Sequence, residues 1–321
     1  MPRLPAITRR PGWSAWAMVM RRIVSAIADR LGPSRASLEA VYARPQSRFI
    51  EVDGVRVHCM DEGPRDALAV VVLSSQWTSI DQWDGWSAAL RDRYRFVRIE
   101  LPGQGLTGPF PDGDYAMPRY RALVETALDR LGIGRLVLTG TSFSGPVAFG
   151  IAAAAGERLV GLILANASGM PRLPGSPTPN TPAPTAWLRW CSRYWQGRSF
   201  FAWKLAELLR DKKRITPELI REYADFNTIR GRVKESAARN AAYESSSHLA
   251  MLAQIRVPTL ILWSGHSPYL PITDAARYRE ALTRAPSQIR IYDDVGHLIV
   301  QDAPERTGRD VRAFVDGVVQ R

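Results

Sequence analysis

From residue 48 onward, short runs of apolar residues alternate with longer segments in which apolar residues recur at helical spacing. The helical spacing predicts helices at 118–131, 142–155, 217–223, 273–282 (capped by Thr273) and 304–319. The apolar runs predict strands at 48–52, 55–60, 69–73, 95–100, 135–139, 159–165, 259–263 and 288–292. Strands that alternate with helices pair mainly in parallel, so we expect an α/β fold with helices on both faces of the sheet.

This alternation stops between residues 170 and 250. The stretch begins with a proline-rich linker and continues with a predicted aromatic helix at 186–210. A helical insertion between two strands of a parallel sheet is typical of a lid. We therefore divide the chain into an extension at 1–47, a core at 48–169 and 251–321, and a lid at 170–250. The lid aromatics either pack as core or line a hydrophobic pocket.

The extension carries much of the formal net charge of +12, and the stretch from Arg172 to Arg256 is also basic. Residues 1–48 hold nine arginines against Asp29 and Glu39, and an amphipathic helix is predicted from Trp13 to Leu31. Arginines interrupt this helix, so it contains no run of apolar residues long enough to cross a bilayer. We expect a cytoplasmic protein whose helix lies either on an anionic membrane surface or on the protein's own body. No nucleic-acid-binding signature accompanies the charge, so we expect no nucleic acid partner.

A serine stands among small residues at the predicted strand-to-helix junction, in the sequence Gly140-Thr141-Ser142-Phe143-Ser144-Gly145. Small residues permit a sharp turn that would expose the Ser142 hydroxyl above the sheet. The backbone amide of Phe143 would then point toward an oxyanion. Far downstream, His297 follows the last predicted strand. A loop histidine in this place is a candidate general base for Ser142.

Several segments resemble the α/β-hydrolase superfamily, in its serine-nucleophile, lid-bearing branch. They are the segments 52–58, 101–108, 140–145 and 295–297, which occur in the order that the family shows. The resemblance implies an α/β-hydrolase fold with Ser142 as nucleophile and His297 as base. It also implies that the backbone amides of Gln76 and Phe143 form the oxyanion hole.

The chain departs from the family pattern at several places, among them Ser144 in place of a usual glycine, Gln104 in place of a histidine and Glu100 in place of an aspartate. Ser74-Ser75 replaces the usual His-Gly, and Ser267 occupies the position of the catalytic aspartate. The alternative position for an acid holds Asn166, so both positions are neutral. A Ser267 hydroxyl could accept the Nδ1–H bond of the histidine and hold its tautomer, but it could not offset the imidazolium charge. Rescue by Asp293, Asp294 or a lid carboxylate is the alternative.

These residues predict a serine hydrolase that cleaves an ester, thioester or related acyl bond in a hydrophobic small molecule, with a weakened triad. The alternatives are a non-hydrolytic lyase or cyclase on the same fold and a binding protein that has lost the chemistry. No dinucleotide fingerprint, phosphate loop or metal-ligand cluster occurs in the sequence, so we expect neither a cofactor nor a metal.

Overall fold

The computed structural model describes residues 27, 30–154, 156–171, 196–243 and 249–320. The predicted proline-rich linker, the first part of the 186–210 helix and nearly all of the N-terminal amphipathic helix lie outside these residues. Contact of that helix with a membrane stays a prediction. Among the described helices, none combines the length and the apolar character that a bilayer crossing requires.

Eight strands form one sheet in the order β1-β2-β4-β3-β5-β6-β7-β8. The β1/β2 and β2/β4 pairs are antiparallel and the other pairs are parallel, so the expected mainly parallel sheet is confirmed. The strands are β1 (Ser47–Val52), β2 (Val55–Glu62), β3 (Ala69–Leu73), β4 (Arg95–Ile99), β5 (Leu136–Ser142), β6 (Leu159–Ala167), β7 (Thr259–His266) and β8 (Ser287–Gly296).

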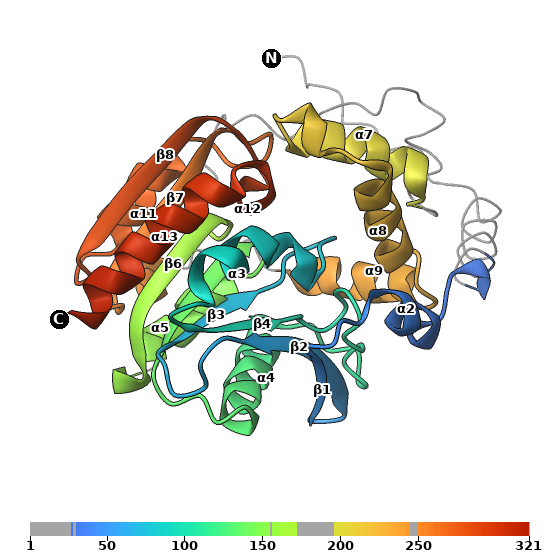
Figure 1. Cartoon of the computed structure of the whole chain (residues 1–321), viewed down its shortest axis with the longest axis horizontal. Coiled ribbons are helices and arrows are strands. Elements are labelled where there is room, and N and C mark those ends of the chain that lie inside the picture. Colours follow the sequence, from blue (N-terminus) through green and yellow to red (C-terminus); the bar gives the residue numbers. More distant parts are fainter. Residues whose placement is uncertain (1–26, 28–29, 155, 172–195, 244–248, 321) are drawn as a thin grey trace, which may run out of the picture.

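Helices cover both faces of the sheet (Figure 1). One face packs against α3 (Asp84–Leu90) and α13 (Pro304–Val319), and its core includes Trp86 and Phe314. The opposite face packs against α4 (Met117–Arg130), α5 (Gly145–Ala154) and α11 (Asp274–Ala281), and α10 (Leu249–Leu252) packs on α5 and α11. The inner strands β3, β4, β5, β6 and β7 are buried on both faces and read as mostly apolar runs, whereas the edge strands β1 and β8 are partly exposed.

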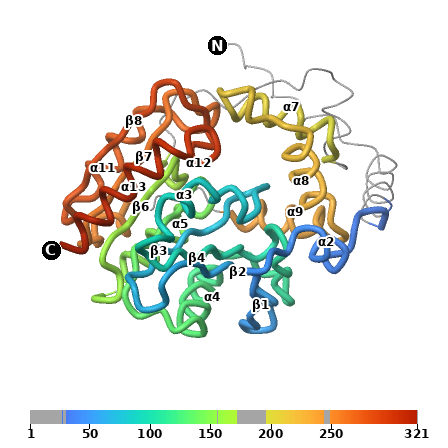
Figure 2. Tube along the Cα trace, in the orientation of Figure 1, coloured from blue at the N-terminus to red at the C-terminus, as the bar shows by residue number. Residues whose placement is uncertain are grey.

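The segment between β6 and β7, which we call the insertion, contributes α7 (Arg198–Leu208), α8 (Pro217–Asn227) and α9 (Arg232–Ala242). The short helix α2 (Arg35–Tyr42) lies beside α8 and α9 although it is far from them in the sequence (Figures 1 and 2). The Tyr42 hydroxyl donates to Asp225 at 2.7 Å, and the Arg230 amide donates to the Pro33 carbonyl at 3.1 Å. The described end of the extension therefore packs on the protein's own body.

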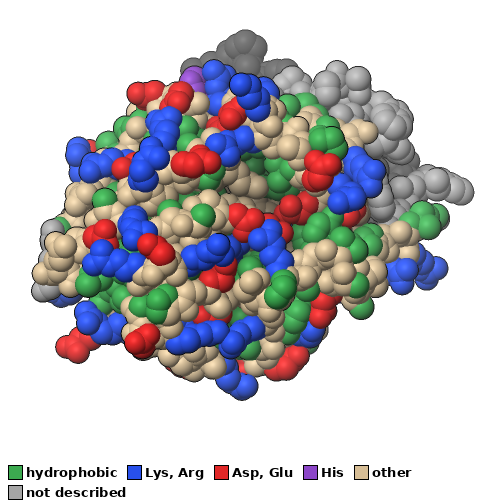
Figure 3. Space-filling model, in the orientation of Figure 1, with side chains coloured by type: hydrophobic (Ala, Val, Ile, Leu, Met, Phe, Trp, Pro, Cys, Tyr) green, Lys and Arg blue, Asp and Glu red, His purple; other side chains and the backbone are tan. Residues whose placement is uncertain are grey.

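Two details of the sequence-based expectation need correction. Thr273 precedes α11, but its side chain makes no capping hydrogen bond, because its backbone is already helical rather than extended. The basic stretch of the insertion is partly internal, since Arg232 is only 2% exposed and pairs with Glu235. On the face drawn in Figure 3, Lys and Arg side chains are interspersed with Asp and Glu.

Candidate active site

Ser142 ends β5 in a strained turn, with a backbone φ of +45°. The turn needs glycine on both sides, because a Cβ on Gly140 would lie 2.7 Å from that of Ala148 and one on Gly145 would lie 2.6 Å from that of Ala167. Ser144 stands where the family has glycine, and its hydroxyl accepts from the Thr141 amide at 2.9 Å. These contacts hold the Ser142 side chain above the carboxyl edge of the sheet.

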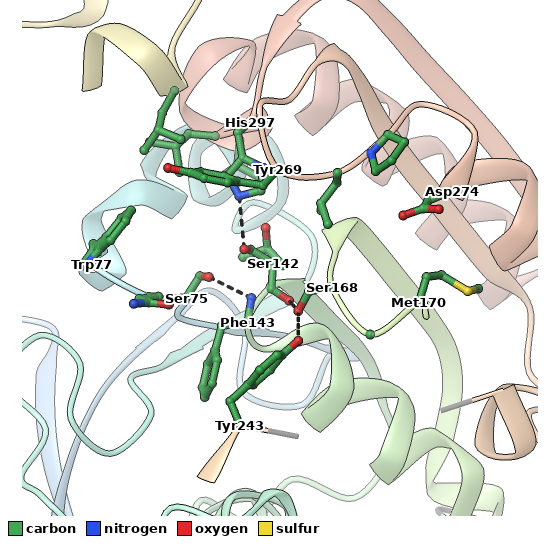
Figure 4. A pocket seen from close by; sticks show the side chains of 18 of the residues that line it. Ser75, Trp77, Ser142, Phe143, Ser168, Met170, Tyr243, Tyr269, Asp274 and His297 are labelled. Atoms are coloured by element: carbon green, nitrogen blue, oxygen red, sulfur yellow. Dashed lines mark hydrogen bonds between the residues drawn. The ribbon is translucent and has the colours of Figure 1, made fainter. Parts of the chain in front are cut away.

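His297 follows β8 and is buried, with 6% of its surface exposed. Its Nε2 lies 3.1 Å from the Ser142 hydroxyl, and the two side chains point toward one another in Figure 4. The other ring nitrogen, Nδ1, lies 2.9 Å from the Ser267 hydroxyl. The fold thus brings Ser142, His297 and Ser267 together from three loops at one end of the sheet.

The residue predicted as an alternative acid position has a different contact. Asn166 is the next-to-last residue of β6, and its side-chain amide donates to the backbone carbonyl of His297 at 2.8 Å and to the Ser264 hydroxyl at 2.8 Å. It therefore contacts the backbone of His297 and has no hydrogen bond to the ring. Sequence reasoning placed Asn166 near the histidine but could not tell which part of the histidine it contacts.

The alternative in which Asp293 or Asp294 replaces the missing acid is wrong. Asp293 is exposed, and Asp294 pairs with Arg306 at 2.6 Å on the surface. Among the described residues, no carboxylate hydrogen-bonds to His297. Both side chains are exposed on β8, so their closeness to His297 in the sequence does not place either carboxylate beside its ring.

Burial and a nearby cation keep the imidazole neutral. Burial, together with the positive charge of Lys204, lowers the pKa of His297 to about 4. Lys204 comes from α7, donates to the Tyr269 hydroxyl at 2.6 Å and pairs with Glu207 at 2.6 Å. The Tyr269 ring stands edge-on to His297, with centroids 5.1 Å apart. The sequence analysis did not identify Lys204 as a site residue. The only feature that could have pointed to it is its position beside the aromatic residues Phe200, Phe201 and Trp203.

The backbone amide of Phe143 already has a partner. It donates to the Ser75 hydroxyl at 3.3 Å, as Figure 4 shows. Ser75 occupies the position where the family resemblance expects glycine, so its hydroxyl lies directly in front of this amide. The second residue expected there, Gln76, also lines the cavity.

A cavity of about 950 Å³ opens beside Ser142 and His297. The insertion, the loop after β3 and the loops after β6 and β7 enclose it. Its apolar and aromatic walls include Trp77, Met170, Leu208, Tyr243, Leu270 and Leu298. Within the described part of the chain, no group of three or more His, Cys, Asp and Glu side chains is placed to hold a metal ion.

A second buried histidine belongs to the scaffold. His58 on β2 contacts Glu100 at 2.9 Å and Ser47 at 2.8 Å, and Glu100 also accepts from the Ile80 and Leu106 amides. These hydrogen bonds join β1, β2 and the loop after β4. His58 does not line the cavity.

Comparison with known proteins agrees with this architecture. The alpha/beta hydrolase family matches residues 70–309. The cis-3-alkyl-4-alkyloxetan-2-one decarboxylase of Xanthomonas campestris is 26% identical over 288 residues, which cover 82% of this chain and 93% of that relative. A 2-hydroxy-6-oxononadienedioate/2-hydroxy-6-oxononatrienedioate hydrolase of Cupriavidus pinatubonensis is 24% identical over 276 residues, again with 82% and 93% covered.

Solved structures show the same fold. A bacterial membrane phospholipase A superposes with a TM-score of 0.72 at 21% identity, over 95% of this chain and 97% of that one. A variant of the meta-cleavage product hydrolase CumD superposes with a TM-score of 0.71 at 19% identity, over 84% of this chain and 98% of that one. Since the family match covers more than half of the sequence and the strand order agrees with it, this chain belongs to the alpha/beta hydrolase family.

Proposed function

We propose that this protein is a serine hydrolase that cleaves an ester, thioester or related acyl bond of a hydrophobic small molecule through an acyl-enzyme on Ser142. The 3.1 Å contact between the Ser142 hydroxyl and His297 Nε2, at the wall of the cavity, is the observation that carries the proposal. A nucleophile within hydrogen-bond reach of a neutral base is what acyl transfer requires.

The proposed reaction has two steps. The Ser142 hydroxyl attacks the acyl carbon while its proton passes to His297 Nε2, and the same nitrogen then protonates the leaving group. Water attacks the resulting acyl-enzyme and loses its proton to His297 Nε2, which returns it to the Ser142 oxygen as the bond to the acyl group breaks and the acid product leaves. The amides of Phe143 and Gln76 would stabilise the oxyanion in both steps.

The walls of the cavity support a hydrophobic substrate. Trp77, Met170, Leu208 and Leu270 all line the cavity beside Ser142. The insertion would act as a lid, because α7 supplies Leu208 to the cavity and contacts the loop that carries His297. The Leu298 amide donates to the Leu208 carbonyl at 3.4 Å.

The absence of a carboxylate beside His297 Nδ1 predicts slow turnover. In serine triads, replacing the acid lowers turnover by roughly 10⁴, or about 5 kcal/mol of barrier. Ser267 is neutral, and Lys204 places a positive charge near the ring, so both disfavour the imidazolium that forms during acylation. We therefore propose a hydrolase with a low rate or a strongly activated substrate.

A non-hydrolytic lyase or cyclase is the second candidate. The neutral Ser267 contact favours it, because a transfer in which His297 gives up one proton as it accepts another builds up little imidazolium charge and so depends less on an acid beside the ring. The Xanthomonas relative is named a decarboxylase, which is an independent reason to keep this candidate. In this reaction Ser142 would position the substrate and His297 would move a proton.

Covalent labelling tests the proposal. The intact chain and Ser142→Ala are incubated with a fluorophosphonate, and the mass increase is followed over time. Labelling of the unmodified chain that is absent in Ser142→Ala supports an activated serine. If the folded chain is not labelled while its cavity still binds a hydrophobic fluorescent probe, the hydrolase proposal fails and the lyase or binding alternatives gain.

A further inference from the structure

The Ser267 hydroxyl has three hydrogen-bond partners. The backbone amide of Tyr269 donates to it at 3.2 Å, and that of Leu270 donates at 3.0 Å. His297 Nδ1 lies 2.9 Å from the same oxygen. A hydroxyl has two lone pairs and one hydrogen. The two amides use both lone pairs, so the hydrogen remains for the histidine.

We infer that Ser267 donates its hydroxyl proton to His297 Nδ1 and thereby holds the resting histidine in the tautomer that carries hydrogen on Nε2. Among the described residues no other acceptor contacts the Ser267 hydroxyl. In this tautomer His297 Nε2 donates to the Ser142 hydroxyl at 3.1 Å and cannot accept its proton. The sequence predicted the opposite direction, with Ser267 as acceptor.

The reason for the difference is the number of lone pairs. A carboxylate has about four lone-pair sites, so an aspartate at this position could accept from both amides and from Nδ1–H together. A serine cannot, because the turn at 267–270 supplies two amide donors that the sequence did not reveal. The substitution therefore reverses the direction of a hydrogen bond as well as removing a charge.

This inference deepens the proposed function and rests on it for its effect on rate. Ser142 can lose its proton only to the other tautomer, in which Nε2 is free and Nδ1 carries the hydrogen. His297 can adopt that tautomer when the Ser267 oxygen gives up one of its two amide donors and accepts from Nδ1–H instead. Ser267 is thus a positioning residue that sets how often His297 is ready to act as a base.

Nitrogen-15 NMR of the histidine ring tests the tautomer directly. The whole chain is labelled with ¹⁵N-histidine, and long-range ¹H–¹⁵N correlations are recorded near neutral pH. His297→Gln identifies the His297 signals among those of the four histidines. We expect hydrogen on Nε2 in the unmodified chain and on Nδ1 in Ser267→Asp. Hydrogen on Nδ1 in the unmodified chain would overturn the inference.

Ser267→Asn is the matched control, because asparagine has the shape of aspartate but can donate to Nδ1. It should keep hydrogen on Nε2. Fluorophosphonate labelling should be at least about tenfold faster in Ser267→Asp than in the unmodified chain, and no faster in Ser267→Asn. A rate in Ser267→Asn equal to that in Ser267→Asp would contradict the role given to the tautomer.

The two proposals fail in different ways. If neither the unmodified chain nor Ser267→Asp is labelled, the serine hydrolase proposal fails, and the NMR assignment of the tautomer still stands. If labelling occurs and the unmodified chain shows hydrogen on Nδ1, the hydrolase proposal stands and the role inferred for Ser267 fails.

Discussion

Asn166 holds the backbone of His297, with its side-chain amide donating to the histidine carbonyl at 2.8 Å. The same side chain accepts from the Ser264 amide at 3.0 Å, so it joins the ends of β6, β7 and β8. Its backbone φ of +43° lies in the left-handed region, which asparagine tolerates better than most residues. An amide side chain suits this position because it can donate one hydrogen bond and accept another at the same time.

Asn166→Ala should therefore destabilise the fold and slow the reaction. Loss of the buried hydrogen bonds, together with the left-handed backbone, should lower the free energy of unfolding by about 2–4 kcal/mol. Urea unfolding measures this change, and fluorophosphonate labelling measures the effect on Ser142. Asn166→Asp is the informative companion, because its carboxylate would face the His297 carbonyl and should not speed labelling. Faster labelling in Asn166→Asp would show that this position can supply the missing acid.

Ser75→Gly should raise the rate of acyl transfer. The Ser75 hydroxyl accepts from the Phe143 amide at 3.3 Å, so it competes with the oxyanion for that donor. Removing one competing hydrogen bond of about 1 kcal/mol should increase kcat roughly fivefold. Ser75→Ala separates the hydroxyl from the added backbone freedom of glycine and should give a similar gain. A fall in kcat for both variants would mean that the hydroxyl donates to the oxyanion.

The pH profile should be flat well below neutrality. His297 acts as a base only when neutral, and that form is lost as pH falls through the pKa of about 4. We expect kcat/KM to stay constant from about pH 8 down to about pH 5, whereas an unperturbed histidine would lose half its activity near pH 6.5. Ser267→Asp should move the midpoint upward, because a carboxylate stabilises the imidazolium. Circular dichroism at each pH separates titration from unfolding.

Arg232→Met should detach α9 from the core. Arg232 donates to the Gly105 carbonyl at 2.8 Å and to Glu235 at 3.1 Å, and it is almost fully buried. Its loss removes the hydrogen bond to Gly105 and one of the two arginine partners of Glu235, the other being Arg35, so the free energy of unfolding should fall by about 2–4 kcal/mol. The exposed Lys234 lies on the same helix, and Lys234→Met should change it by less than about 0.5 kcal/mol. Equal effects of the two variants in urea unfolding would show that Arg232 does not hold the helix.

The regular part of the fold was predictable from the sequence because its signals are local. The eight apolar runs became the eight strands, and 304–319 matched α13 in full. The small residues around Ser142 predicted its sharp turn, because side-chain size can be read directly from the sequence. Helices α2, α3 and α9 were missed. The buried side of α9 consists of Arg232, Glu235 and Arg239, and charged side chains give no apolar pattern that would predict a helix.

The chemistry of the site depends on contacts between residues that are far apart in the sequence. The sequence determined that Ser142 and His297 are present and that both acid positions are neutral. Only the tertiary structure decided that Ser267, and not Asn166, faces His297 Nδ1, and that two backbone amides already donate to the Ser267 hydroxyl. Hydrogen-bond direction depends on every donor and acceptor around an atom, and those neighbours are defined only when the loops after β7 and β8 are folded side by side.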